Sequence, residues 1–282
     1  MTELQKKQLE ILKQFVRVCE KHNLRYSLEG GTAIGAVRHK GFIPWDDDVD
    51  VMMPREDYDK FIQLQYEYDG TPYFIQTWKS DPHYCYNFAK LRDSSTTYIE
   101  NFFVNHVINH GVWIDIFPID GICKKNKPMK KTGGRPRRVW FHFYMCYVPA
   151  LLRKVRKRTF FKDIFFNIIG ALFYVFNIAH FHNRVCDRIM RKWTIDNCAL
   201  SGNMCSLPLK KQAMPSYIYK EYIKVPFEDM EVSLIKDYDI YLSRCYGDYM
   251  TPPKEGKRTG HHKEKGVSFT QGYKEYMKEH RI

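Results

Sequence analysis

The sequence predicts a mixed α+β fold in which helices pack on a mixed sheet. Three segments lead to this prediction: residues 2–19 carry apolar side chains at helical spacing, residues 48–53 alternate as a strand does, and residues 111–117 are mostly apolar. Apolar residues make up 44% of the 282 residues and charged residues 27%. With no low-complexity segment, this composition excludes a disordered or fibrous chain.

The N-terminal elements follow from local signals. Thr2 and Gln5 fit a capping box, and the helix that they open is expected to end near residues 22–23. Residues 25–29 then predict a short strand that stops at the Gly30-Gly31 pair. Residues 32–38 carry enough apolar side chains for a short helix.

The next elements complete a core through about residue 122. Residues 48–53 predict a strand, and Pro54 is suited to the first turn of a helix that runs through residue 64. Residues 88–91 and 111–117 predict two further strands, the second one buried. Near the C-terminus, residues 236–245 have helical spacing and stop at Gly247, which is a typical residue after a helix end.

The order of elements and the charge pattern divide the chain into three predicted segments: a mixed α/β core (1–123), a basic and aromatic helical insert (124–181), and a C-terminal part that completes the domain of the core (182–282). Between Cys123 and Thr159 there are 13 Lys or Arg and no Asp or Glu. Without these 13, the chain has as many basic as acidic residues, 32 of each. A local positive patch favours a phosphate-bearing or membrane partner and argues against general nucleic-acid binding.

The insert also has an apolar part. Residues 164–179 include 13 apolar residues in 16, and as a helix they would span about 24 Å, less than the roughly 30 Å hydrocarbon core of a bilayer. Apolar and aromatic segments beside basic clusters are typical of a helix that lies on an anionic leaflet. We therefore expect residues 124–181 to contact an anionic membrane surface. Two buried core helices, or a membrane span, are the alternatives.

The cysteines and the N-terminus indicate the compartment. The eight cysteines are scattered without metal-binding spacing, which predicts buried free thiols in a reducing environment. The first residues lack the apolar run of a signal peptide. We expect a cytoplasmic protein, held peripherally at the inner face of the membrane. Aromatic residues reach 16%, which further suggests an interface with sugar or lipid.

The strongest chemical signal is the segment from Leu28 to Val51. Glycines at the end of a strand let the backbone approach a ligand and offer amide groups to it. Four aspartates follow within five residues, and such closely spaced carboxylates repel one another unless a cation is bound. They are Asp46, Asp47, Asp48 and Asp50. On a strand, Asp48 and Asp50 would share a face about 6.6 Å apart, suitable for one or two Mg²⁺ ions beside a phosphate. A solvated acidic turn is the alternative.

A third carboxylate is expected to complete this site. Asp115 lies in an apolar strand, where a lone Asp is costly unless it is paired or bound to metal. It could also cap a neighbouring turn. Asp120, beyond Pro118, is expected in a turn. Asp115 is therefore the better candidate.

These motifs resemble the signature of the LicD family, which is similar to the fukutin and fukutin-related proteins. The resemblance is carried by GGTAIGAVRHKGFIPWDDDVDVMMPREDYDKF (residues 30–61) and extends through residues 90–93, 113–120 and 246–250. It implies a nucleotidyltransferase-like fold and transfer of a phospho-alcohol, often phosphocholine from CDP-choline, to a cell-surface glycan. It places the catalytic metal ligands at Asp48, Asp50 and Asp115. An offset reading would include Asp46.

The remaining candidate residues are those suited to bind substrate. Cationic side chains near the acidic run would bind phosphate oxygens, and an aromatic ring would stack on a base or hold a quaternary ammonium group. Each of these side chains has a plainer alternative, a solvated surface position or packing under a loop. The candidates are Gly30, Gly31, Thr32, Arg38, His39, Trp45, Lys90, Arg92, Arg258 and His261.

Together these features predict a phosphotransferase that depends on Mg²⁺, with Mn²⁺ as the alternative ion. It would move a phospho-alcohol such as phosphocholine from a CDP-linked donor to a hydroxyl of a cell-surface or lipid-linked glycan, as in lipopolysaccharide or teichoic acid modification. Two other functions remain open. One is a glycosyltransferase or nucleotidyltransferase with the same Asp-x-Asp metal site, and the other is an anionic-lipid-binding scaffold without activity.

Overall fold

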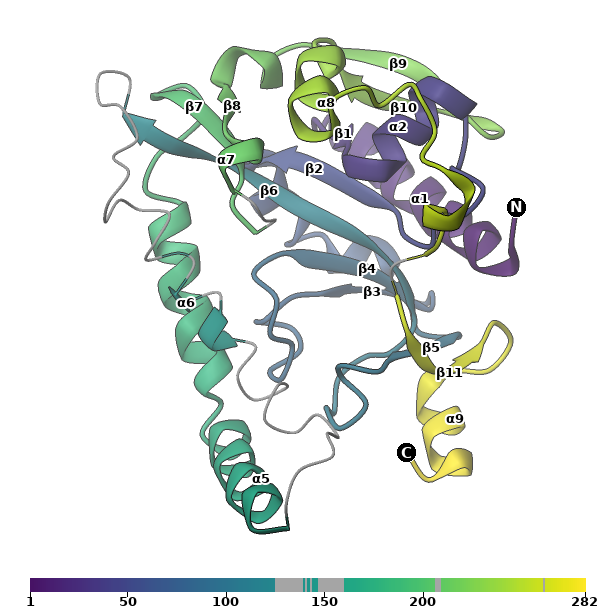
Figure 1. Cartoon of the computed structure of the whole chain (residues 1–282), viewed down its shortest axis with the longest axis vertical. Coiled ribbons are helices and arrows are strands. Elements are labelled where there is room, and N and C mark those ends of the chain that lie inside the picture. The colour runs from purple at the N-terminus through teal and green to yellow at the C-terminus, as the bar shows by residue number, and fades with distance from the viewer. Residues whose placement is uncertain (125–138, 140, 143, 147–159, 206–208, 261) are drawn as a thin grey trace.

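The computed structural model describes residues 1–124, 139, 141–142, 144–146, 160–205, 209–260 and 262–282 (Figure 1). Within these ranges, helices surround a mixed sheet, which confirms the mixed α+β class. The basic residues of 125–138 and 153–158 and the candidate His261 lie outside the described residues. The predicted segments 124–181 and 182–282 therefore remain predictions.

The N-terminal part contains most of the main sheet. Its elements are α1 (Glu3–Lys21), β1 (Ser27–Leu28), α2 (Gly30–His39), β2 (Asp50–Pro54), α3 (Arg55–Phe61), the short 3-10 helix η1 (Gln65–Tyr68), β3 (Tyr73–Gln76), β4 (Ala89–Asp93), β5 (Thr97–Glu100) and β6 (Val112–Lys124).

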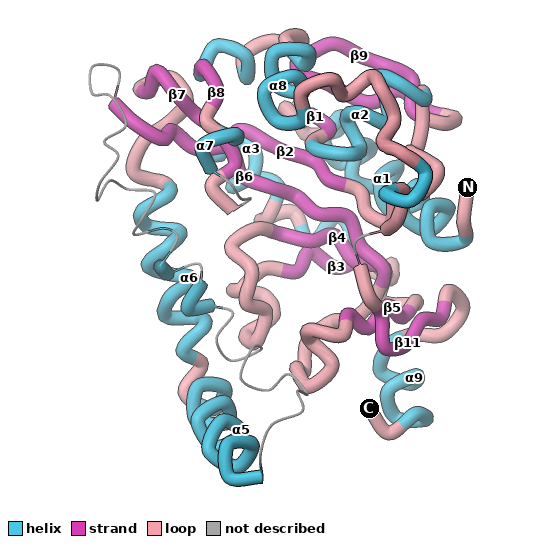
Figure 2. Tube along the Cα trace, in the orientation of Figure 1, coloured by secondary structure: helices cyan, strands magenta, loops and turns pink. Residues whose placement is uncertain are grey.

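The C-terminal part adds two helices that extend away from the sheet, followed by short strands and helices (Figure 2). Its elements are α5 (Phe160–Val175), α6 (Ile178–Met190), β7 (Cys198–Asn203), α7 (Leu209–Gln212), β8 (Met214–Pro215), η2 (Ser216–Tyr219), β9 (Tyr222–Phe227), β10 (Met230–Ile235), α8 (Tyr238–Tyr246), η3 (Glu255–Lys257), β11 (Glu264–Ser268) and α9 (Tyr273–His280).

Strand β6 organises the main sheet, whose order is β1-β2-β6-β4-β3, with β7 pairing β6 and β8 pairing β7. The pairing of β2 with β6 is parallel, and all the other pairings are antiparallel. The first half of β6 pairs β4 and the middle pairs β2, whereas β7 pairs the end. The predicted strand 111–117 therefore continues to residue 124, because new partners take over beyond Phe117.

Two smaller sheets lie outside the main one. Strands β9 and β10 form a hairpin, and β11 pairs β5 near α9 (Figure 1). The sequence analysis did not predict these four strands, nor β3, β7 and β8. Each is only two to six residues long and is paired largely through its backbone, so its side chains carry little periodic signal.

Helix α1 is the best-predicted element. The Thr2 hydroxyl accepts a hydrogen bond from the Gln5 amide, and the Gln5 side chain accepts one from the Thr2 amide, which confirms the capping box. Its apolar face packs against β4 and β6. Gly247 directly follows the last residue of helix α8 and has φ +73°, which confirms it as the residue that ends the helix.

Four local predictions were wrong. Helix α2 begins at Gly30, two residues earlier than predicted, and α3 ends at Phe61 instead of continuing to residue 64. Strand β2 begins at Asp50, so Asp48 lies in the preceding loop and does not share a strand face with Asp50. Asp120 is not in a turn: it lies within β6, is fully buried, and pairs with the guanidinium of Arg55.

The described cysteines agree with the sequence analysis. Seven of the eight have side chains that the structure describes, and all seven are buried thiols. In most of them burial raises the pKa of the thiol, as for Cys85 and Cys186, because a thiolate would lose its hydration. These side chains therefore act as small apolar core residues.

One buried histidine makes stability depend on pH. His110 is 2% exposed, and burial lowers its pKa from 6.5 to about 4. Between these two values the unfolded chain binds a proton that the folded chain excludes, so stability falls as pH decreases from 6.5 to 4, by about 3 kcal/mol in total. We expect His110→Gln to flatten this part of the curve of unfolding free energy against pH, measured by urea denaturation. The exposed His280→Gln is the control, and a wild-type slope in His110→Gln would contradict the prediction.

Candidate active site

The predicted carboxylates Asp50 and Asp115 lie side by side on neighbouring parallel strands. Asp50 of β2 is directly in register with Asp115 of β6, and Asp115 is in turn opposite Lys90 of β4. The Lys90 Nζ is 2.8 Å from the Asp115 Oδ1, although Lys90 is only 1% exposed. The Thr32 hydroxyl accepts a hydrogen bond from the Asp50 amide at 2.9 Å and thereby ties β2 to α2. Sheet pairing thus brings together residues that are 65 positions apart.

The other aspartates occupy a loop that α1 holds in place. The Gln5 Nε2 donates to the carbonyls of Ile43 and Asp46, and the Gln8 Nε2 donates to the carbonyl of Asp47 at 2.9 Å. Both glutamines are 1% exposed. The sequence analysis missed their role. It could have been inferred because two amide side chains lie on the buried face of an amphipathic helix, where polar groups need hydrogen-bond partners.

The Gly30-Gly31 pair allows α2 to begin against these carboxylates. Gly30 has φ +58°, and a Cβ there would lie 3.1 Å from the Asp50 Oδ2. A Cβ on Gly31 would come within 2.6 Å of the Asp46 Oδ2. The predicted close backbone approach is therefore present, and the amide end of α2 points at the acidic cluster. We use this name for Asp46, Asp47, Asp48, Asp50 and Asp115.

Crowding shifts the ionisation of the acidic cluster. Burial, together with repulsion from Asp48, raises the pKa of Asp46 to about 8. Burial and the neighbouring carboxylates also raise the pKa of Asp50 well above its usual value. Burial raises the pKa of Asp115 as well, against the opposing charge of Lys90. A cation bound among these oxygens would relieve the repulsion, and hard carboxylate oxygens are the ligands that Mg²⁺ prefers.

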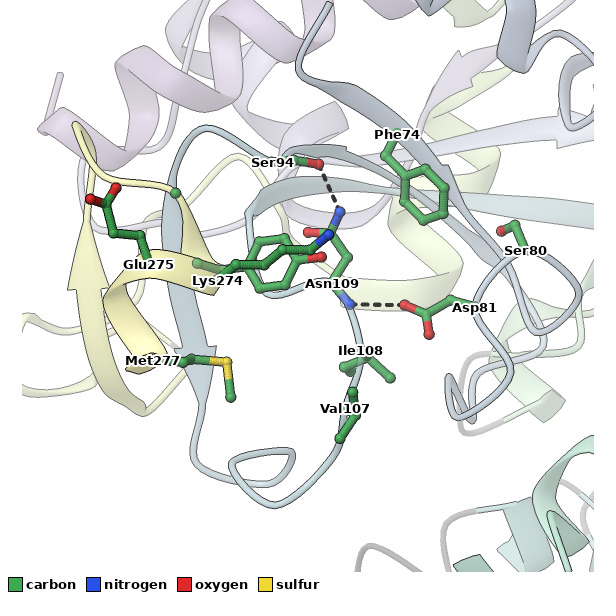
Figure 3. A pocket seen from close by; sticks show the side chains of 12 residues that line it. Phe74, Ser80, Asp81, Ser94, Val107, Ile108, Asn109, Lys274, Glu275 and Met277 are labelled. Carbon is green, nitrogen blue, oxygen red and sulfur yellow. Dashed lines mark hydrogen bonds between the residues drawn. The ribbon is translucent and has the colours of Figure 1, made fainter. Parts of the chain in front are cut away.

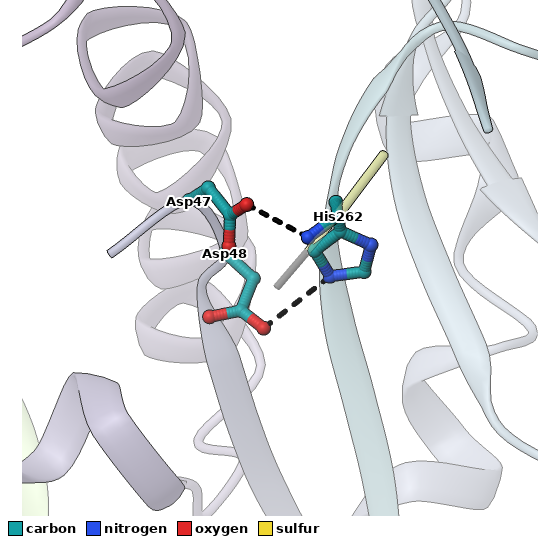
Figure 4. Close-up of side chains that lie close together, drawn as sticks. All are labelled: Asp47, Asp48 and His262. Carbon is teal, nitrogen blue, oxygen red and sulfur yellow. Dashed lines mark hydrogen bonds and ion pairs between the residues drawn. The ribbon is translucent and has the colours of Figure 1, made fainter. Parts of the chain in front are cut away.

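His262 contacts the acidic cluster, although the sequence analysis selected its neighbour His261. The His262 Nε2 is 3.4 Å from the Asp48 Oδ2, and its backbone amide donates to the Asp47 Oδ2 at 2.8 Å (Figure 4). Side-chain atoms of Asp47, Asp48 and His262 all lie within 4.8 Å of one another. Burial opposes protonation of His262, but hydrogen bonds to Asp48 and Glu100 outweigh it and raise the pKa to about 10. His262 therefore supplies positive charge to the cluster.

Glu29 is a second residue that the sequence analysis missed. It directly precedes Gly30 and is 3% exposed, and burial raises its pKa to about 7. The Glu29 Oε1 accepts a hydrogen bond from the Asn203 side chain at 2.9 Å. Among the described residues its Oε2 has no hydrogen-bond partner. The sequence signal that could have identified Glu29 is its position directly before the Gly30-Gly31 pair.

Four predicted substrate-binding residues gather next to the acidic loop. The Arg38 Nε donates to the His39 Nε2 at 2.9 Å, and the His39 ring meets Trp45 edge-on. The Arg258 guanidinium lies over the Trp45 ring, 5.1 Å from its centroid. Burial and the charge of Arg258 lower the pKa of Arg38, because the two guanidinium groups are close. This cationic group is suited to bind phosphate oxygens.

Lys90 and Arg92 take different positions from those expected of a phosphate clamp. Both are buried on one face of β4 against Trp113, with the Lys90 Nζ 4.1 Å from the ring centroid. Lys90 pairs with Asp115 and thus contacts the acidic cluster. The Arg92 guanidinium donates to the Gln76 side chain and to the Gly111 carbonyl, so its hydrogen bonds are directed into the fold.

Comparison with known proteins identifies the family. A model of the family described as LicD/FKTN/FKRP, nucleotidyltransferase domain, matches residues 23–161. The lipopolysaccharide cholinephosphotransferase LicD of Haemophilus influenzae is 31% identical over 259 residues, which cover 90% of this chain and 92% of that protein. The chain belongs to the LicD family. This confirms the resemblance that the motifs carry.

A second relative of this LicD-family protein matches over a shorter segment. The ribitol 5-phosphate transferase FKRP of Homo sapiens is 45% identical over 56 residues, 20% of this chain and 11% of that protein. The mouse protein of the same name gives the same values. The names of these relatives refer to the phosphates of two different alcohols, choline and ribitol.

Proposed function

We propose that this LicD-family protein transfers a phospho-alcohol from a CDP-linked donor to a hydroxyl group of a cell-surface or lipid-linked glycan. The match over 90% of the chain to a cholinephosphotransferase carries the proposal. The acidic cluster at the amide end of α2 supports it, because phosphoryl transfer is catalysed mainly by positioning and by stabilising charge. A nucleotidyltransferase-like arrangement of the sheet is part of the same proposal.

Each part of the site has a proposed role. Asp48, Asp50 and Asp115 would hold Mg²⁺, and the carboxylate of Asp46 next to Asp48 would support them. When bound, the ion would neutralise the diphosphate and assist departure of CMP. Lys90 and His262 limit the negative charge of the cluster, and they orient Asp115 and Asp48. The cationic group around Trp45 would bind the donor.

A screen of donors tests this function. The protein is incubated with Mg²⁺, a lipid-linked glycan and CDP-choline, CDP-ribitol or CDP-glycerol, and CMP release and phospho-alcohol transfer are measured. We expect one CDP-alcohol to give both products, and neither to form when EDTA is added. Sugar transfer from a UDP-sugar would instead support a glycosyltransferase, and binding to lipid without turnover of any donor would support the scaffold.

We also propose that the protein docks on the inner face of an anionic membrane. Along α5 and at the residue that follows it, six apolar side chains at helical spacing are 43–74% exposed: Ile164, Phe165, Ile168, Leu172, Val175 and Phe176. The sequence adjoining this face carries the 13 basic residues of 124–158. An apolar face next to positive charge complements an anionic lipid surface. No helix within the described ranges is long and apolar enough to span a bilayer.

Liposome sedimentation tests the membrane proposal. We expect binding to anionic vesicles to exceed binding to neutral ones, and to weaken with salt, since the Debye length falls from about 10 Å at 0.1 M to about 3 Å at 1 M. Changing the basic run of 153–158 to Gln should reduce anionic binding by about tenfold or more. The residues changed are Arg153, Lys154, Arg156, Lys157 and Arg158.

The double variant Phe165→Gln/Leu172→Gln should remove the salt-resistant part of the binding, because that part comes from apolar burial. Both side chains are about half exposed, so the fold loses little. Ile240→Gln on α8, which is 41% exposed, is the matched control. Equal binding of wild type to neutral and anionic vesicles would contradict the proposal.

A further inference from the structure

A cavity of about 850 Å³ lies between β3, the loop around Asn109 and helix α9, and it has no role in the mechanism described above. Phe74, Ser80 and Asp81 line one side, and Lys274 and Met277 of α9 line the opposite side (Figure 3). Tyr273, Ile108 and Asn109 complete the lining. The cavity thus combines aromatic and apolar surface with a few convergent polar groups, as ligand pockets do.

Asp81 is a fixed hydrogen-bond acceptor in this cavity. It is 8% exposed, and its Oδ2 accepts a hydrogen bond from the Asn109 amide at 2.8 Å (Figure 3). The same oxygen accepts a hydrogen bond from the Gln76 side chain, also at 2.8 Å. The Asn109 side chain is itself held by the Ser94 hydroxyl at 2.7 Å. Within the described residues the Asp81 Oδ1 has no recorded partner. A carboxylate oxygen held in this way can accept an O–H or N–H of a ligand.

A chain of polar contacts connects the cavity to the acidic cluster. From Asp81 it continues through Gln76 to the Arg92 guanidinium, whose Nη2 is 3.8 Å from the Glu100 Oε2. The Glu100 Oε1 is 3.7 Å from the His262 Nδ1, and His262 meets Asp48. Burial raises the pKa of Glu100, but the neighbouring cations outweigh it and lower the pKa to about 2, so Glu100 is ionised. A continuous series of polar contacts therefore connects the two sites.

Strand β5 has contacts near both sites. On β5, Glu100 faces His262, whereas the Thr97 hydroxyl donates to the Gln271 carbonyl, next to the Gly272 that lines the cavity. Three residues along a strand span about 10 Å. About 10 Å along β5 therefore separates the residue that faces His262 from the residue that is hydrogen-bonded to the segment lining the cavity.

The lining favours a neutral ligand rich in hydroxyl groups. The carboxylates of Asp81 and Glu275 outnumber the ammonium group of Lys274 in the lining, so the cavity disfavours a phosphate, whereas the Asp81 carboxylate can accept O–H groups. Tyr273, Phe74 and Ile108 offer apolar surface for the C–H face of a sugar ring, while Asp81 and Asn109 meet its hydroxyl edge. We propose that this cavity binds a sugar residue of the acceptor glycan. This inference rests on the proposed transferase function and extends it by locating the binding site of the acceptor.

Direct sugar binding without any donor tests the inference. Methyl glycosides of glucose, galactose and N-acetylglucosamine are titrated into the full chain and followed by saturation-transfer NMR. We expect at least one to bind, and Asp81→Asn to raise its Kd about tenfold, because an acceptor oxygen becomes an NH₂ group. Met277→Trp, which fills the cavity from α9 without touching the Asp81 network, should also weaken binding. Lys278→Gln, on the same helix but outside the lining, should bind as wild type does.

Other outcomes would overturn the inference. Unchanged sugar binding by both Asp81→Asn and Met277→Trp would place the sugar elsewhere, and absence of any binding would remove the subsite. Binding of free ribitol or choline that depends on Asp81 and Met277, without binding of any glycoside, would assign the cavity to the alcohol of the donor. Turnover of a CDP-alcohol without cavity-dependent sugar binding would leave the proposed function in place and refute only this inference. Cavity-dependent sugar binding without turnover of any CDP-alcohol would refute the proposed function and leave the sugar-binding cavity in place.

Discussion

Replacing Asp50 by Asn is expected to reduce Mg²⁺-dependent CMP release about 100-fold or more while leaving the fold intact. Asp50 is in register with Asp115 and beside the amide end of α2, so its carboxylate lies where the ion would be held. Loss of a metal ligand removes the charge stabilisation on which phosphoryl transfer depends. The fold should tolerate Asn, since burial and repulsion already raise the pKa of Asp50, and Asn removes one charge from the cluster.

The neighbouring aspartates make the test more specific. Asp48→Asn should also abolish activity. Asp115→Asn should do so at a cost in stability, because it leaves the buried Lys90 ammonium without its counter-ion. The control Asp229→Asn removes an exposed carboxylate that pairs with Lys13 and should change neither property. Near-normal turnover of Asp50→Asn at saturating Mg²⁺ would show that the metal ligands lie elsewhere.

The largest effect on stability is expected at Arg55. Its side chain donates from Nε to the Asp120 Oδ1 at 2.8 Å, and the Asp120 carboxylate is fully buried. Arg55 also lies 3.4 Å from Asp187. Burial opposes the charge on Arg55, but Asp120 and Asp187 outweigh it and raise its pKa. Arg55→Met should lower the free energy of unfolding by about 3–5 kcal/mol, because the Asp120 charge is left buried and unpaired. Urea denaturation measures this change.

Two further variants separate the loss of the pair from other effects. In the double variant Arg55→Met/Asp120→Leu no lone charge remains, so most of the stability should return. Lys13→Met, which removes one partner of the exposed Lys13–Asp229 pair, should leave the free energy of unfolding nearly unchanged, because solvent screens that pair. An Arg55→Met protein as stable as wild type would show that Asp120 finds another partner or is neutral in the fold.

The sequence alone determined features that depend on neighbouring residues. The capping box at Thr2 and the end of α8 at Gly247 are set by side chains and backbone within a few positions, so local patterns were sufficient. The same holds for the clustering of aspartates at 46–50 and for the family signature. The family assignment that these motifs predicted was confirmed by the match over 90% of the chain.

Tertiary structure decided which distant residues meet. Register between β2 and β6 places Asp115 beside Asp50, and the chain returns at residue 262 to bring a histidine to Asp48. Arg92, which the sequence suggested as a phosphate ligand, instead directs its hydrogen bonds to Gln76 and Gly111. A charge pattern gives the type of a side chain but not its partner, because the partner is chosen by strand pairing across long stretches of sequence. The sequence therefore determined the chemistry available to this protein, and the sheet decided which of those groups form one site.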